Sequence, residues 1–137
     1  MRGKAGRPRL FVRINGLTTG LADDDLDGVM AAAPDGIVLP KAVGGADIQH
    51  LGAKLAVREA EFGLADGATA IVALSTETAG SIFALGTLPG ASHRLKGISW
   101  GGEDLSLEVG AHANRLEDGT LVAECRRQAF MKKRESV

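Results

Sequence analysis

Four clusters of polar and charged residues in this sequence each follow a short apolar run. They are Arg13-Ile14-Asn15, Pro40-Lys41, Ser75-Thr76-Glu77-Thr78 and Gly101-Gly102-Glu103-Asp104. The first two clusters each supply a cation, and the last two supply carboxylates. If the fold gathers them, such groups could hold a divalent metal ion and an anionic substrate.

The carboxylates Glu77 and Asp104 are the candidate metal ligands. Mg²⁺ usually takes one or two protein carboxylates and completes its octahedron with water and substrate oxygens. Each residue also has a structural explanation, because Glu77 could favour a helix N-terminus and Asp104 could cap a helix beginning at Leu105. Their pairing at the ends of adjacent strands favours the metal site.

The cations and glycines near these carboxylates suit an anionic substrate. The Arg13 guanidinium can hold a substrate carboxylate bidentately, or it can pair with the acidic residues themselves. Gly101 and Gly102, next to Glu103, would let backbone N–H groups approach a substrate oxygen. Lys41 would need to be neutral to form a Schiff base, and nearby carboxylates favour its charged form, so we expect a structural or electrostatic role.

Apolar runs rich in β-branched residues predict the strands that would position these groups. They cover residues 10–14, 36–39, 70–74 and 95–100. The runs are short and lack clean alternation, which is typical of strands covered on both faces. Helical patterns follow them over residues 23–34, 47–63, 79–85, 105–110 and, after a polar turn, 121–132.

The strands begin near positions 10, 36, 70 and 95, which gives spacings of 26, 34 and 25 residues. Alternation of strands and helices at this spacing predicts an α/β fold with a parallel sheet, either doubly wound or closed as a barrel. A (β/α)8 TIM barrel uses ~31 residues per βα unit. We therefore predict a partial TIM barrel of about four parallel βα units over residues 10–129, with a basic flexible tail at 1–9 and a C-terminal tail at 130–137. Ligands would bind at the carboxyl ends of the strands.

Composition excludes several classes of protein. The chain has 16 Lys and Arg against 17 Asp and Glu, so it lacks the basic surplus that binds nucleic acid. No apolar run approaches the ~20 residues that span a bilayer, and no apolar segment follows the first charges, so we expect a cytoplasmic protein without a membrane partner. The single cysteine, Cys125, cannot form an internal disulfide and has no histidine at metal-ligand spacing.

The same clusters carry a family resemblance. Taken in order, the segments 11–15 (FVRIN), 35–41 (DGIVLPK), 76–80 (TETAG) and 101–105 (GGEDL) resemble the citrate lyase beta-subunit-like aldolases, which include malyl-CoA and related acyl-CoA lyases. The resemblance covers roughly residues 10–129. It implies a Mg²⁺-dependent barrel enzyme that cleaves or forms a carbon–carbon bond in an acyl-CoA thioester of a hydroxy acid, with an acyl-CoA or a 2-oxo acid as the small-molecule substrate.

The resemblance also implies roles for individual residues. Arg13, Glu77 and Asp104 would form the catalytic set, with Glu77 and Asp104 as the metal ligands. Arg13, Gly102 and Glu103 would bind the substrate.

The family pattern contains further βα units on either side of the segments found here. A second hypothesis is therefore a truncated, non-catalytic half-barrel subunit that functions only by assembly with a partner chain. Open strand edges of such a half-barrel predict a homo-oligomer. A doubly wound nucleotide binder is a third possibility, but no glycine-rich run has the spacing of a phosphate-binding loop.

Overall fold

Parallel strands alternate with helices throughout the part of the chain that the computed structural model describes, which is residues 8–110 and residue 117. The strands are β1 (Phe11–Arg13), β2 (Gly36–Leu39), β3 (Ala70–Leu74) and β4 (Leu95–Ser99). The helices are α1 (Ala22–Met30), α2 (Gly45–Glu61), α3 (Ala79–Ala84) and α4 (Gly102–Glu108), with short 3-10 turns η1 (Leu17–Thr19) and η2 (Leu85–Thr87).

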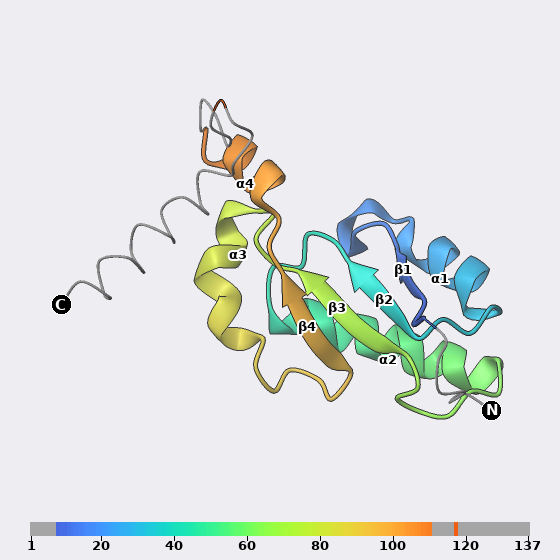
Figure 1. Ribbon diagram of the computed structural model, residues 1–137. Coiled ribbons are helices and arrows are strands. Elements are labelled where there is room, and N and C mark those ends of the chain that lie inside the picture. The colour runs from blue at the N-terminus through green and yellow to red at the C-terminus, as the bar shows by residue number, and fades with distance from the viewer. Residues whose placement is uncertain (1–7, 111–116, 118–137) are drawn as a thin grey trace.

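The strands form one parallel sheet in the order β1-β2-β3-β4 (Figure 1). One row of paired residues crosses the sheet, because Ile37 of β2 pairs with Val12 and with Ile71, and Ile71 pairs with Leu95. Strands that follow one another in chain order are typical of consecutive barrel units, whereas a doubly wound sheet reverses its order at a switch point. The predicted α/β fold is confirmed, and the described part resembles a segment of a barrel wall.

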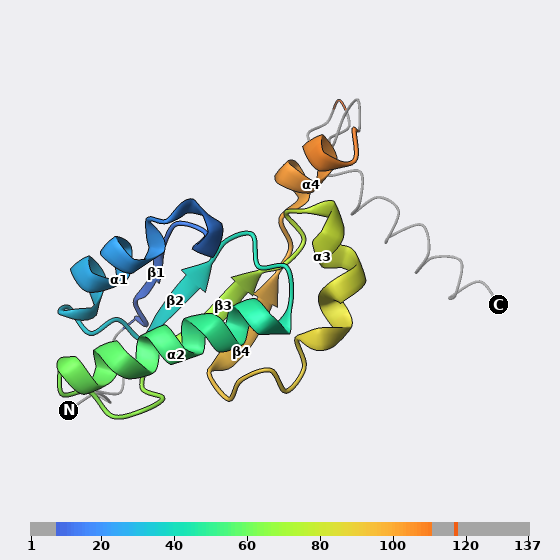
Figure 2. The ribbon, with the colours of Figure 1, turned by 180° about the vertical axis from the view of Figure 1, so that it is seen from behind.

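The helices α1 and α2 cover one face of the sheet (Figure 2). They bury apolar side chains at helical spacing, as Ile48, Leu51 and Leu55 of α2 show. These side chains pack on strand residues of the same face and on α1, and the core contains Leu26, Met30, Ile37, Leu39, Ile71 and Ala73. Successive side chains of β2 and β3 therefore point alternately into this core and toward the opposite face of the sheet.

The opposite face of the sheet corrects the expectation that both faces are covered. Val38, Val72 and Leu74 alternate with the core residues and are only half-buried. In a closed barrel this face would point into the interior, where side chains of all strands fill the space. The apolar run of each strand therefore indicates a barrel interior rather than a second layer of helices.

Two helices begin earlier than expected. Helix α2 begins at Gly45 rather than at Asp47, whose side chain accepts a hydrogen bond of 2.8 Å from the N–H of Val43. This reach back across the first turn resembles a capping box. Helix α4 begins at Gly102, so Asp104 lies within its first turn and is not the cap of a helix beginning at Leu105.

Several expectations fall on residues outside the described part. The helix expected over residues 121–132, Cys125 and most of the two tails belong to this group. The domain boundaries at residues 9 and 129 therefore stay predictions. None of the described helices is long and apolar enough to cross a membrane.

Candidate functional site

A cavity of about 360 Å³ lies at the carboxyl ends of the strands. Its walls come from the ends of β1, β3 and β4 and from the start of α4. The residues to which the resemblance gave a role all line this cavity: Arg13, Glu77, Gly102, Glu103 and Asp104. Leu74, Trp100 and Gly101 complete its wall. Segments separated by more than 90 positions in the chain thus meet in one place, as a parallel sheet requires.

Glu77 is a buried carboxylate in this cavity, with 7% of its surface exposed. It directly precedes Thr78, which caps α3 by accepting a hydrogen bond from the N–H of Ser81. One carboxylate oxygen, Oε2, accepts a hydrogen bond of 2.5 Å from the backbone N–H of Lys41. Among the described contacts Oε1 has no such partner, so it can face a ligand.

Gly101 packs against Glu77. A Cβ at position 101 would overlap the Cγ of Glu77, although the φ of −106° is open to any residue. Glycine is therefore needed here for space, not for backbone conformation. The N–H of Gly101 donates a 2.7 Å hydrogen bond to Oγ1 of Thr76, and the role expected for Gly101 in substrate binding stays a prediction.

Gly102 lies against the indole of Trp100. A Cβ at position 102 would lie 2.8 Å from the indole Nε1. Trp100 itself is half-exposed and forms part of the cavity wall. Trp100 is not among the expected site residues, although the only tryptophan of the chain directly precedes the two glycines. The backbone role expected for Gly102 and Glu103 stays a prediction.

Asp104 pairs with Lys41 across the cavity rim. The Lys41 Nζ lies 3.6 Å from Asp104 Oδ2, and these side chains are 57% and 40% exposed. Lys41 thus contacts both candidate metal ligands, Glu77 through its backbone and Asp104 through its side chain. The signal in the sequence was its position directly after β2, which matches the position of the other site residues.

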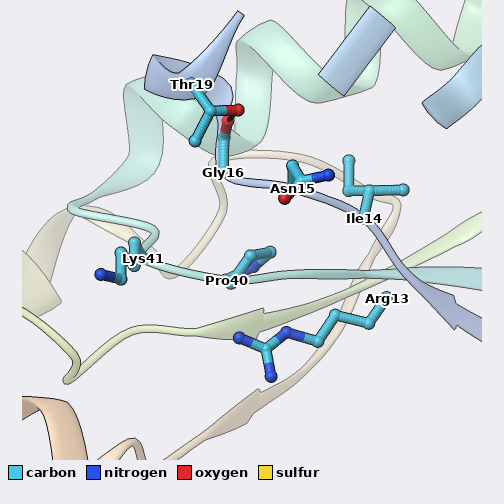
Figure 3. Close-up of a pocket in the computed structure, with 7 residues that line it drawn as sticks. All are labelled: Arg13, Ile14, Asn15, Gly16, Thr19, Pro40 and Lys41. Carbon is cyan, nitrogen blue, oxygen red and sulfur yellow. Dashed lines mark hydrogen bonds between the residues drawn. The ribbon is translucent and has the colours of Figure 1, made fainter. Parts of the chain in front are cut away.

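Arg13, at the end of β1, lines this cavity and a second one of about 450 Å³ (Figure 3). The other residues of the second cavity are Ile14, Asn15, Gly16, Thr19, Pro40 and Lys41. Arg13 and Lys41 are the charged groups of this wall, and the Asn15 amide donates a hydrogen bond of 2.9 Å to Asp25. Neither Glu77 nor Asp104 forms an ion pair with Arg13 within residues 8–110, which leaves the guanidinium able to bind a substrate carboxylate.

The donor atoms fit a hard divalent cation. Glu77 and Asp104 offer carboxylate oxygens in one cavity, which is the number of protein carboxylates that Mg²⁺ usually takes. No group of three or more His, Cys, Asp or Glu side chains that could hold a metal occurs among the described residues. A zinc site, with its tetrahedral set of nitrogen and sulfur ligands, does not fit the described part of the chain.

Known proteins similar to this chain include two curated lyases. The citrate lyase subunit beta of Leuconostoc mesenteroides subsp. cremoris is 33% identical over 114 residues, which is 83% of this chain and 37% of the relative. The malyl-CoA/beta-methylmalyl-CoA/citramalyl-CoA lyase of Chloroflexus aurantiacus is 32% identical over 117 residues, again 83% of this chain and 33% of the relative. The chain therefore spans about a third of the length of these relatives.

Solved structures agree with the sequence relatives. RipC from Yersinia pestis has a TM-score of 0.63 and 26% identity, over 75% of this chain and 44% of that one. CitE from Mycobacterium tuberculosis in complex with magnesium and acetoacetate has the same TM-score and identity, over 85% of this chain and 42% of that one. The family model of the HpcH/HpaI aldolase/citrate lyase group matches residues 3–136. The resemblance seen in the sequence is thus confirmed, and the chain belongs to the HpcH/HpaI aldolase/citrate lyase family.

Proposed function

We propose that the chain carries the metal and substrate site of a Mg²⁺-dependent carbon–carbon lyase that acts on an acyl-CoA thioester of a hydroxy acid. The observation that carries this proposal is the gathering of all the expected site residues in one cavity at the carboxyl ends of the strands. The relatives support it, since they are named citrate lyase and malyl-CoA lyase. CitE structures hold magnesium with oxaloacetate, and magnesium with acetoacetate and coenzyme A.

Each residue has a role in this reaction. Glu77 and Asp104 would hold the ion, which supplies a Lewis acid for carbonyl and carboxylate oxygens when bound. Cleavage of the carbon–carbon bond leaves its electron pair on the acyl-CoA fragment as an enolate and turns the hydroxyl-bearing carbon into the carbonyl of a 2-oxo acid, whose carboxylate the Arg13 guanidinium would bind. Leu74 and Trp100 give the cavity wall an apolar surface beside the reacting atoms.

A second proposal concerns assembly. Within the described sheet β1 and β4 are edge strands, and a parallel edge exposes unpaired backbone groups. Large apolar side chains, Phe83 and Leu107, are exposed on the β4 side. We therefore propose that the chain forms a homo-oligomer. The alternative to the lyase is a non-catalytic half-barrel that functions only by assembly with a partner chain. A cytoplasmic location stays a prediction.

Calorimetric titration with MgCl₂ tests the metal site. Wild type should bind Mg²⁺ at about millimolar or tighter affinity, and Glu77→Gln should abolish binding, because the carboxylate that remains, Asp104, is half-exposed and paired with Lys41. Glu61→Gln, which removes an exposed carboxylate of α2, is the matched control and should bind like wild type. Identical binding by wild type and Glu77→Gln would contradict the site.

The same preparation tests the substrate and assembly proposals. With Mg²⁺ present, pyruvate or glyoxylate should bind weakly and Arg13→Ala should lose that binding. Because the chain matches only about a third of the length of these relatives, we expect the isolated chain to cleave malyl-CoA or citramalyl-CoA little or not at all. Turnover that survives Arg13→Ala, Glu77→Gln and Asp104→Asn would contradict the assignment. A stable 14.2 kDa monomer in light scattering at high concentration would contradict the homo-oligomer.

A further inference from the structure

Lys41 has a backbone conformation that is unusual for a lysine. Its φ is 53°, in the left-handed region that non-glycine residues seldom adopt. This sharp bend follows β2 directly and brings Lys41 to the carboxyl end of β3. There its backbone N–H holds Glu77 at 2.5 Å, while its Nζ lies 3.6 Å from Asp104. One residue therefore contacts both of the carboxylates that would bind the metal.

The two contacts differ in strength. The hydrogen bond to Glu77 is short and lies in a partly buried place, and any side chain at position 41 except proline would preserve it. The ion pair with Asp104 is longer, and both side chains are about half-exposed, so solvent screens it. Lys41 thus fixes Glu77 firmly and holds Asp104 weakly.

The Lys41 side chain also lines the second cavity, where the remaining charged group is Arg13 (Figure 3). It therefore lies at the boundary between the two cavities, and Arg13 lines both. When the ammonium is not paired with Asp104, it can contact an anion that is bound beside Arg13 in the second cavity. A flexible four-carbon stem allows this change without movement of the backbone.

We propose that Lys41 is a substrate-binding residue whose ammonium alternates between the metal ligand Asp104 and the substrate. Its ammonium neutralises Asp104 before Mg²⁺ binds, is displaced when the ion takes that carboxylate, and then pairs with the carboxylate of the 2-oxo acid beside Arg13. The inference rests on the proposed metal site. It adds a competition between Lys41 and Mg²⁺, and a cooperation between metal and substrate, that the lyase assignment alone does not contain.

The competition predicts opposite effects of one substitution. Lys41→Met removes the ammonium and retains the backbone N–H to Glu77, so Mg²⁺ should bind about two- to fivefold tighter, the range expected for a screened ion pair. Pyruvate, titrated at saturating Mg²⁺, should bind about tenfold weaker, because a charge-assisted hydrogen bond is lost. Lys41→Arg keeps the charge and should restore both constants toward those of wild type.

Lys54→Met is the matched control. Lys54 also pairs with an aspartate, Asp23 at 2.7 Å, but it lies on α2 and lines neither cavity. The Lys54→Met substitution removes the same charge as Lys41→Met, so it reports any effect of net charge alone. We expect both binding constants to stay at their wild-type values in this variant.

The outcomes separate the inference from the proposed function. If wild type binds no Mg²⁺, the metal site is wrong and the inference fails with it. If wild type binds Mg²⁺ but Lys41→Met leaves both constants unchanged, or weakens both together as a loss of structure would, the metal site stands and the alternating role is overturned. Tighter Mg²⁺ with weaker pyruvate supports the role, since a structural lysine would not shift the two in opposite directions.

Discussion

The two ends of the sheet use the same kinds of charged groups in different ways. At the amino end, Arg94 pairs with Glu59 at 2.8 Å, and the side chains are 3% and 1% exposed. At the carboxyl end, Lys41 pairs with Asp104 at 3.6 Å, and the side chains are 57% and 40% exposed. One pair is buried and fully bonded, whereas the other is open to solvent and to ligands.

The buried cluster acts as a clamp. Glu59 of α2 accepts hydrogen bonds from the N–H groups of Gly67 and Thr69 before β3, and from Arg94 directly before β4. Burial tends to raise the pKa of Glu59, but the hydrogen bonds from Arg94, Thr69 and Gly67 outweigh it, and the pKa lies below the ordinary value. Because both oxygens of the Glu59 carboxylate accept hydrogen bonds, neither is available to bind a ligand.

The comparison indicates what distinguishes a structural charge from a functional one. In the clamp the charges neutralise each other and join three segments of the chain. In the cavity a carboxylate keeps an oxygen without a described partner, and the cation beside it is held loosely. A loss of charge should therefore reduce stability at the amino end and ligand binding at the carboxyl end.

The largest expected effect is the loss of stability on breaking the clamp. Glu59→Gln removes the charged bidentate partner of the buried Arg94 guanidinium and leaves Asp66, at 2.6 Å, as its remaining carboxylate, so we expect the free energy of unfolding to fall by about 2–3 kcal/mol. Urea denaturation measures it. Glu77→Gln is the comparison, and its cost should stay below about 1.5 kcal/mol because the amide oxygen can still accept from Lys41. Similar losses in the two variants would contradict the distinction between the ends.

The pH dependence gives an independent readout of the clamp. Because the pKa of Glu59 is lowered in the folded chain, its contribution is full above the ordinary value of 4.5 and is lost as the pH falls through the lowered pKa. Wild type should therefore lose its advantage over Glu59→Gln on the acid side of that value. An advantage that stays constant into strong acid would exclude the ionised carboxylate as its source.

Local patterns predicted much of the fold. The strands over 36–39 and 70–74 have the bounds expected from their β-branched runs, and the apolar spacing of α2 identified its buried face. The start of α4 was wrong because two glycines carry no helical pattern, yet they form its N-cap and first residue. The expectation that both faces of the sheet are covered was also wrong. A strand that faces a barrel interior and a strand that lies under helices have the same apolar composition, so the sequence does not distinguish them.

The site residues could be predicted because the carboxyl ends of parallel strands meet. This topological rule needs only the strand ends, so it placed Arg13, Glu77 and Asp104 together before any geometry was known. The clamp could not be found in this way. Glu59 and Arg94 lie 35 positions apart, and their pairing depends on the packing of α2 against β3 and β4. The contact of Lys41 with both carboxylates depends on a positive φ that lysine gives no reason to expect.

A smaller effect is expected from crowding the cavity wall. Gly101→Ala would place a methyl group on the Cγ of Glu77, at a cost of about 1–3 kcal/mol in unfolding free energy. The carboxylate must move, so Mg²⁺ affinity should fall in the same variant. Gly80→Ala in α3, where a Cβ would meet nothing within 4 Å, is the control and should be neutral or slightly stabilising. Unchanged metal binding in Gly101→Ala would show that the position of Glu77 does not matter.

The smallest effect should come from an exposed pair outside both ends. Lys54 of α2 pairs with Asp23 of α1 at 2.7 Å, and this hydrogen bond with Lys54 lowers the pKa of Asp23, whose side chain is half-exposed. Lys54→Met should reduce the free energy of unfolding less than any destabilising variant above, and less still in about 1 M salt, where charges are screened within ~3 Å. Lys41→Met should be at least as mild in the same denaturation experiment, because its pair is longer and its lysine side chain is more exposed than that of Lys54. A loss of several kcal/mol in Lys41→Met would place that lysine with the buried clamp rather than with the cavity.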